Sequence, residues 1–186
     1  MMRTETLPDV LQTDLRLLSI GLNPSLPSIA AGFYFANPRN RFWKALNAST
    51  LLHERVSPGP DSMRQLLECE GFGFTDLVKR PTRGASELRV QDYRQGAPRL
   101  YALINRYQPR YAWFHGKLAY KNFLRYGGMD TEGGHWGLQQ QRIGESRIFV
   151  TPNPSPANAA FSLADLVTWY DRLADCLASV PRASVG

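Results

Sequence analysis

The 186-residue chain has no run of eighteen or more apolar residues and only two cysteines. A membrane-spanning helix needs about 20 consecutive apolar residues, so we expect no contact with a membrane. Residues 1–16 carry acids where a secretory signal has a basic segment followed by an apolar one, and we therefore expect a cytoplasmic protein. Cys69 and Cys176 show no CxxC or CxxH pattern for zinc or an iron–sulfur cluster. We expect two buried thiols, no metal and no other cofactor.

Two classes of enzyme are also disfavoured by what is missing. Neither GxGxxG nor GxxxxGK[ST] occurs, which disfavours a small nucleotide-binding α/β domain. The histidines His53, His115 and His135 have no metal-ligand spacing and no associated nucleophile, so a hydrolase triad is unsupported. We interpret His115, at the end of an apolar run, as a hydrogen-bonded structural residue.

The composition favours a polyanionic partner. The formal net charge is +6 and the isoelectric point is about 9.6, a modest excess that favours an anion without specifying it. Basic residues cluster in two segments of the chain: Arg39, Arg41 and Lys44 in the first, and Lys79, Arg80 and Arg83 in the second. This clustering favours nucleic acid over other anions as the partner. The length suits one compact domain over residues 1–186, with short flexible tails at its ends.

Short apolar runs that end in loops predict strands at residues 17–22, 71–78, 111–115 and 147–151. Helices are predicted at residues 40–46, 62–70, 117–126 and 162–180. A further helix should begin near Pro98, because proline lacks the N–H that a helix interior needs. This alternation predicts an α/β three-layer sandwich, with a central, largely parallel sheet of four to five strands flanked by helices.

Three of the predicted strands are followed by unusual loops: GLNPS, TDLVKRPT and PNPSPANA. Parallel sheets bind ligands beyond the carboxyl ends of their strands. We therefore expect the three loops to converge on one rim and to form the active site there. Pro24 and Pro27 restrict the first loop, which suits a rigid pocket.

Four sequence blocks carry a family resemblance: GLNPS, GFYFANPRNRFWK, GFGFTDLVKRPT and PNPS, in that order. With these blocks the chain resembles the mismatch-specific uracil/thymine DNA glycosylases, a branch of the uracil-DNA glycosylase superfamily. The similarity extends over residues 17–177. It implies hydrolysis of the N-glycosidic bond of uracil, mispaired thymine or another damaged base in DNA, initiating base excision repair without metal or cofactor. The implied partner is damaged or mismatched DNA. We also expect activity on single strands, a monomer, which suits DNA scanning, and use at the nucleoid.

The resemblance assigns roles to the first two blocks. Asn23 corresponds to the amide that holds the attacking water; it cannot take a proton itself, but a placed water suffices for a good leaving group. A plain Asn-Pro turn is the alternative. Phe35 corresponds to the aromatic ring that stacks on the base, and Gly21, Leu22 and Ser28 complete the implied base pocket. Phe42 and Trp43 are expected in the core.

Asp76 stands in TDLVKRPT at a position where the family is not uniform, and many relatives carry no acid there. A carboxylate at a strand exit could deprotonate the water or stabilise positive charge on the sugar. It could instead pair with Lys79 or Arg80, or cap a turn. Both interpretations stay open on the sequence.

The PNPSPANA loop corresponds to the segment that fills the space left by a flipped base. Its members Asn153, Pro154 and Ser155 match the motif. Where relatives place Leu or Arg at the tip, this chain has Pro156, Ala157 and Asn158, a smaller plug. We therefore expect weak reading of the opposite base. Lys117, at a predicted helix start, is a candidate phosphate contact or a plain surface lysine.

No lysine is positioned by these motifs for Schiff-base chemistry, so we expect a monofunctional glycosylase. The alternative is a protein that binds lesions or mismatches in the same pocket without catalysis. Release of free base from uracil-containing DNA distinguishes the two.

Overall fold

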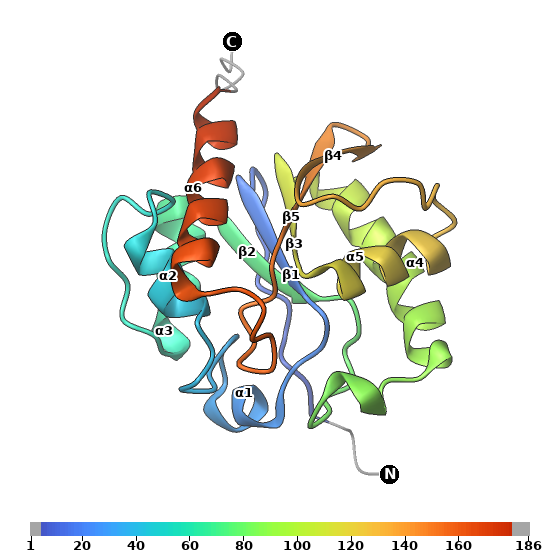
Figure 1. Ribbon diagram of the computed structural model, residues 1–186, viewed down its shortest axis with the longest axis horizontal. Coiled ribbons are helices and arrows are strands. Elements are labelled where there is room, and N and C mark those ends of the chain that lie inside the picture. Colours follow the sequence, from blue (N-terminus) through green and yellow to red (C-terminus); the bar gives the residue numbers. More distant parts are fainter. Residues whose placement is uncertain (1–4, 180–186) are drawn as a thin grey trace.

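The computed structural model describes residues 5–179 and has a five-stranded sheet at its centre, in the order β2-β1-β3-β5-β4 (Figure 1). Four strands are parallel: β1 (Leu17–Gly21), β2 (Phe72–Asp76), β3 (Tyr111–His115) and β5 (Ser146–Thr151). The edge strand β4 (Gly137–Ile143) is antiparallel to β5. The predicted largely parallel α/β sheet is confirmed.

Helices cover both faces of the sheet, which makes three layers (Figure 1). One face carries α2 (Phe42–Ala48), α3 (Pro60–Gln65), which continues into a π-helical turn (Leu66–Glu70), and α6 (Leu163–Ser179). The other face carries α4 (Val90–Tyr107), after a short 3-10 helix (Ala85–Glu87), and α5 (Lys117–Tyr126). Helix α1 (Leu26–Ala31) lies beyond the carboxyl end of β1.

The strands separate two apolar clusters because successive side chains point to opposite faces of a sheet. On β3, Tyr111 and Trp113 belong to the cluster under α2 and α6, whereas Ala112 and Phe114 belong to the cluster under α4 and α5. The parallel strands are therefore buried on both faces, as expected for a parallel sheet between helical layers, whereas the edge strand β4 alternates buried and exposed residues. This rigid arrangement fixes the direction in which all four parallel strands end.

Some sequence predictions are wrong. Helix α4 runs through Pro98 instead of starting there. Pro98 is exposed, so water can reach the carbonyl that its missing N–H leaves free, while Ala97 and Leu100 beside it are fully buried. Strand β4 and helix α1 were not predicted. Cys69 is exposed and Cys176 is half-buried, so neither thiol is fully buried as predicted. The predicted helix end at Val180 and the predicted terminal tails lie outside the described residues.

Within residues 5–179, no helix is long and apolar enough to cross a membrane.

Gly96 lets α4 approach the backbone that follows β2. A Cβ at this position would lie 2.2 Å from the carbonyl oxygen of Leu77. We expect Gly96→Ala to lower the free energy of unfolding by about 2 kcal/mol, although alanine favours an isolated helix by ~1 kcal/mol.

Gly59→Ala is the matched control, because no heavy atom lies within 4 Å of the added Cβ. It should change the unfolding free energy by less than about 0.5 kcal/mol. Urea denaturation of both variants checks the prediction, and equal effects would contradict it.

Candidate functional site

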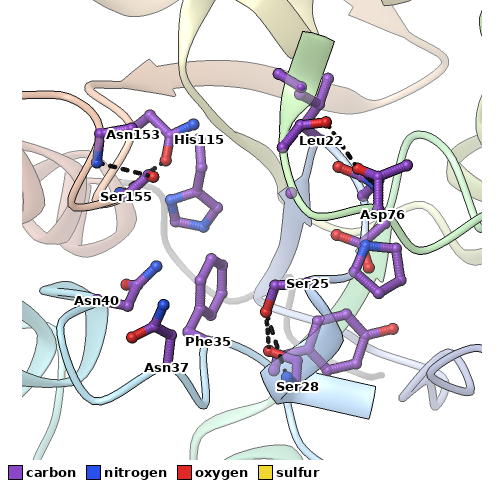
Figure 2. Close-up of a pocket in the computed structure, with 18 of the residues that line it drawn as sticks. Leu22, Ser25, Ser28, Phe35, Asn37, Asn40, Asp76, His115, Asn153 and Ser155 are labelled. Atoms are coloured by element: carbon purple, nitrogen blue, oxygen red, sulfur yellow. Dashed lines mark hydrogen bonds between the residues drawn. The ribbon is translucent and has the colours of Figure 1, made fainter. Parts of the chain in front are cut away.

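The carboxyl ends of the parallel strands open onto one cleft of about 470 Å³, within the range of small-molecule sites. Each strand contributes residues from its exit: Gly21 to Ser25 after β1, Asp76 from β2, His115 from β3 and Asn153 after β5. The loop that carries Phe35 closes the cleft from below in the view of Figure 2. The loops meet on one rim, as the strand directions predict.

The loops after β1 and β2 are fastened to each other. The backbone N–H groups of Leu77 and Val78 each donate to the β1 exit at 2.9 Å, which continues the strand pairing. Asn23 Nδ2 donates to the carbonyl of Arg80 at 3.0 Å and to Thr82 Oγ1 at 2.8 Å. Both amide hydrogens of Asn23 are thus used within the protein. The side-chain atom that Asn23 has left for a ligand is its acceptor oxygen, Oδ1.

Phe35 presents a flat ring to the cleft. Its ring stacks on the buried Phe42 at 4.1 Å between centroids and meets the His115 ring edge-on at 5.1 Å. Because Phe42 covers one face and Phe35 lines the cleft, the other face is open to a planar ligand. Its backbone φ of 58° is unusual for a bulky residue and costs ~1–3 kcal/mol, a strain typical of functional sites.

The Phe35 loop is held rigidly by hydrogen bonds from several sides. Ser25 caps α1, and Ser28 Oγ accepts from the backbone N–H of Ala36 at 3.2 Å. The Trp43 indole N–H donates to the carbonyl of Tyr34 at 3.1 Å. As predicted, Trp43 and Phe42 belong to the core. The ring of Phe35 is therefore preorganised before any ligand arrives.

Three asparagines on one side of the cleft present amide donors. The Oδ1 atoms of Asn37, Asn40 and Asn153 each accept a backbone N–H from two residues further on, at 2.9–3.0 Å. These bonds fix the orientation of each amide and leave its Nδ2 for the cleft that all three residues line. Figure 2 shows Asn37 and Asn40 beside Phe35.

Asn37 and Asn40 were not predicted from the sequence as site residues. The signal was present in the two closely spaced Asn-x-x segments NPR and NRF, which are typical of turns closed by an asparagine side chain.

His115 is hydrogen-bonded, as predicted, but it also lines the cleft. Its Nε2 lies 2.7 Å from Ser19 Oγ, whereas its buried Nδ1 has no partner among the described residues. Burial lowers the pKa of His115 to about 3, so the ring is neutral at pH 7. If Ser19 donates to Nε2, one donor is left unpaired, Nδ1–H; the other tautomer leaves two groups unpaired. The first arrangement is favoured and leaves a neutral, unpaired donor on a residue that lines the cleft.

Asp76 is buried, with 3% of its surface exposed, and its Oδ2 has no hydrogen-bond partner among the described residues. Burial raises the pKa of Asp76 to about 7; Lys79 and Arg99 act in the opposite direction, and Asp9 adds to the rise. Neither pairing considered from the sequence is found. Lys79 is 2.8 Å from Asp9, and Arg80 is 2.8 Å from Asp92. The carboxyl group of Asp76 is therefore able to exchange a proton near neutral pH.

The loop at residues 153–161 is held by Arg41. Its guanidinium donates to the carbonyl of Ser155 at 3.1 Å, of Asn158 at 2.8 Å and of Phe161. Asn158 Nδ2 donates in turn to the carbonyl of Asn153 at 3.0 Å. Both side chains are occupied in shaping the loop, whose residues Ser155, Pro156 and Ala157 line the cleft.

Of the residues singled out from the sequence, those lining the cleft are Gly21, Leu22, Asn23, Ser28, Phe35, Asp76, Asn153, Ser155, Pro156 and Ala157. Pro154, Asn158 and Lys117 do not line it. The Lys117 ammonium lies 4.4 Å from the centroid of the Trp136 ring, a cation–π contact.

The basic residues grouped by the sequence have different roles. Lys79, Arg80 and Arg41 are occupied within the protein. Arg39 and Arg83 are exposed and line the cleft. The part of the chain that the structure describes contains no group of three or more His, Cys, Asp or Glu able to hold a metal ion.

Comparison with known proteins places this geometry in context. The family model of the Uracil DNA glycosylase superfamily matches residues 8–174. The chain also resembles the solution NMR structure of a "putative Uracil DNA glycosylase" from Methanosarcina acetivorans, with a TM-score of 0.59 and 21% sequence identity. The alignment covers 92% of this chain and 98% of that one. At this identity, the structural likeness is a likeness of fold.

The raised pKa of Asp76 makes stability depend on pH. Below about pH 4 the carboxyl is protonated in the folded and unfolded chains; between about pH 4 and 7 only the unfolded chain loses the proton, so stability falls. Asp76→Asn removes this penalty. We expect the variant to exceed the wild type in unfolding free energy by a few kcal/mol more at pH 8 than at pH 4.

For Asp92→Asn, the change in unfolding free energy relative to the wild type should vary with pH in the opposite direction, so the variant loses more stability at pH 8 than at pH 4. The reason is that the hydrogen bond from Arg80 holds the pKa of Asp92 below its ordinary value. Urea denaturation at both pH values measures the two differences. A pH-independent gain in Asp76→Asn would contradict the prediction.

Proposed function

The chain belongs to the Uracil DNA glycosylase superfamily, and from this premise we propose that it is a monofunctional DNA glycosylase that excises uracil from DNA by hydrolysis of the N-glycosidic bond. One observation carries the proposal: an open aromatic face, amide donors and an unpaired buried carboxyl group line the same cleft. Such a cleft fits a base turned out of the DNA stack, which costs a few kcal/mol and is cheapest for mispaired or damaged bases.

The cleft offers uracil both stacking and donors. The free face of Phe35 supplies ~1–3 kcal/mol of stacking. The Nδ2 groups of Asn37, Asn40 and Asn153 and the neutral His115 suit a base with two carbonyl oxygens. Donors to these oxygens also stabilise the negative charge that the departing base develops. We extend the proposal to mispaired thymine and other damaged bases, which share carbonyl acceptors with uracil.

The attacking water is held by Asn23 and activated by Asp76. Asn23 Oδ1 accepts a hydrogen bond from the water, and the Asp76 carboxylate takes its proton as the oxygen bonds to the anomeric carbon of the sugar. The bond to the base nitrogen breaks, and its electron pair leaves with the base. Described residues that line the cleft include no lysine, which supports hydrolysis without a Schiff base.

Two arginines at the mouth of the cleft are the proposed DNA contacts. Arg39 and Arg83 are exposed there and are suited to phosphate. The small residues Pro156 and Ala157 form the plug proposed to fill the vacated space. Asn158 uses its amide within its own loop, which supports weak reading of the opposite base and hence activity beyond one kind of mismatch.

The proposed chemistry is tested by single-turnover release of uracil from an oligonucleotide. We expect Asp76→Asn to lower the rate by ~10²-fold or more, and the wild-type rate to rise with pH through about 7, the pKa of Asp76. The rise follows because a base must lose its proton before it can accept one.

Glu145→Gln is the control, since Glu145 is exposed in the turn before β5, at the opposite end of the strands; it should keep the wild-type rate. Unchanged excision in Asp76→Asn would reject the carboxylate role. Specific binding of uracil-containing DNA without any release of base would favour a non-catalytic lesion reader.

Opposite-base dependence is tested with uracil opposite guanine, opposite adenine and in single strands. We expect rates within about tenfold of one another, because the plug has little reach. Parallel substrates with thymine, hypoxanthine or ethenocytosine define the range of bases through abasic-site formation. Strict dependence on a guanine partner would refute weak opposite-base reading.

A further inference from the structure

Residues 7–10 run along the free edge of β2 and reach the cleft. Val10 and Phe74 exchange two backbone hydrogen bonds of 2.9 Å in an antiparallel bridge. Leu7 lines the cleft. Between them, Asp9 comes to lie beside Thr75, the residue before Asp76.

Asp9 accepts hydrogen bonds from side chains in two other parts of the chain. Its Oδ1 accepts from Thr75 Oγ1 at 2.6 Å and from Lys79 Nζ at 2.8 Å. Its Oδ2 accepts from the Arg99 guanidinium at 3.1 Å. Lys79 follows β2, and Arg99 lies on α4. Asp9 is therefore the ion-pair partner of both cations.

The same two cations are the ones that act on Asp76. Arg99 also donates to the backbone carbonyl of Asp76, so it lies next to this residue without binding its side chain. Asp76 Oδ2 has no partner among the described residues. Asp76, at the cleft, is left without an ion-pair partner within residues 5–179, whereas Asp9 binds both Lys79 and Arg99.

We propose that Asp9 is a positioning residue for Asp76: it binds Lys79 and Arg99, prevents them from pairing with the Asp76 carboxylate, and so preserves Asp76 as a proton acceptor. The proposal rests on the proposed role of Asp76 as the general base. An aspartate paired with two cations would lose its proton readily but would accept one from water poorly.

The other titratable groups around Asp76 do not replace Asp9. Tyr34 accepts from Lys79 at 3.4 Å and donates to the carbonyl of Pro8 at 3.0 Å. Burial raises the pKa of Tyr34 above its ordinary value, so it stays neutral, as does His115 at the exit of β3. Asp9 is thus the negative charge that opposes Lys79 and Arg99 here.

The test follows the titration of Asp76 itself. The ¹³C signal of the Asp76 carboxyl group, identified by its loss in Asp76→Asn, is measured against pH in the wild type and in Asp9→Asn. We expect the midpoint of the Asp76 titration to fall by ~1 pH unit in Asp9→Asn, because no negative charge at residue 9 then balances the positive charges of Lys79 and Arg99. The pH profile of uracil release should move in the same direction. Glu145→Gln, which removes one negative charge at the far end of the strands, should leave both midpoints unchanged.

Lys79→Gln tests the inference in the opposite direction. It removes a positive charge that faces Asp76, so the midpoint should rise. The double variant Asp9→Asn with Lys79→Gln should return toward the wild-type value. If Asp9→Asn does not fold, the double variant decides: a midpoint below that of Lys79→Gln supports the role of Asp9, and an equal midpoint overturns it.

The outcomes separate this inference from the proposed function. An unmoved Asp76 midpoint in folded Asp9→Asn, or a fall in Lys79→Gln, overturns the role of Asp9. Midpoints that move as expected while the pH profile of excision stays fixed support the role of Asp9 and reject Asp76 as the general base.

Discussion

The cleft depends on the pairing of β1 with β2 continuing past the end of the sheet. Gly21 stands opposite Asp76 in the parallel register, and a Cβ on Gly21 would lie 2.4 Å from Asp76 Oδ1. Only glycine allows the two strand exits to approach this closely. The amide hydrogens of Asn23 then fasten the following loops together. An acceptor oxygen from the loop after β1 and a carboxyl group at the end of β2 thereby line the same cleft.

The cleft carries local costs in the stability of the folded chain. A buried carboxyl group without hydrogen bonds destabilises the folded chain, and the strained backbone of Phe35 adds to the cost. The two apolar clusters that hold the sheet between its helical layers offset this cost. Much of the positive charge near the loops also has a structural use, since Arg41 holds backbone carbonyls of the 153–161 loop. The guanidinium of Arg41 is therefore occupied within the protein.

Local patterns predicted most of the fold. The predicted bounds of β3 and α5 match the structure residue for residue, because a short apolar run and a helical stripe are each encoded by neighbouring residues. Strand β4 was missed because GLQQQRI is mostly polar, and only its pairing with β5 makes it a strand. The break expected at Pro98 was wrong because packing of α4 on the sheet outweighs the local preference of proline.

The sequence by itself determined the four parallel strands and most of the helices between them, the loops at the strand exits and the aromatic and amide residues that those loops carry. Only the tertiary structure decided which atoms of these residues remain free. Asn23 keeps its oxygen because its nitrogen is used 57 and 59 residues away, and Asp9, beside the residue that precedes Asp76, binds an arginine 90 residues further along the chain. Hydrophobic periodicity is a local property of the chain, whereas the partners of polar and charged groups are set by contacts between segments that only folding brings together.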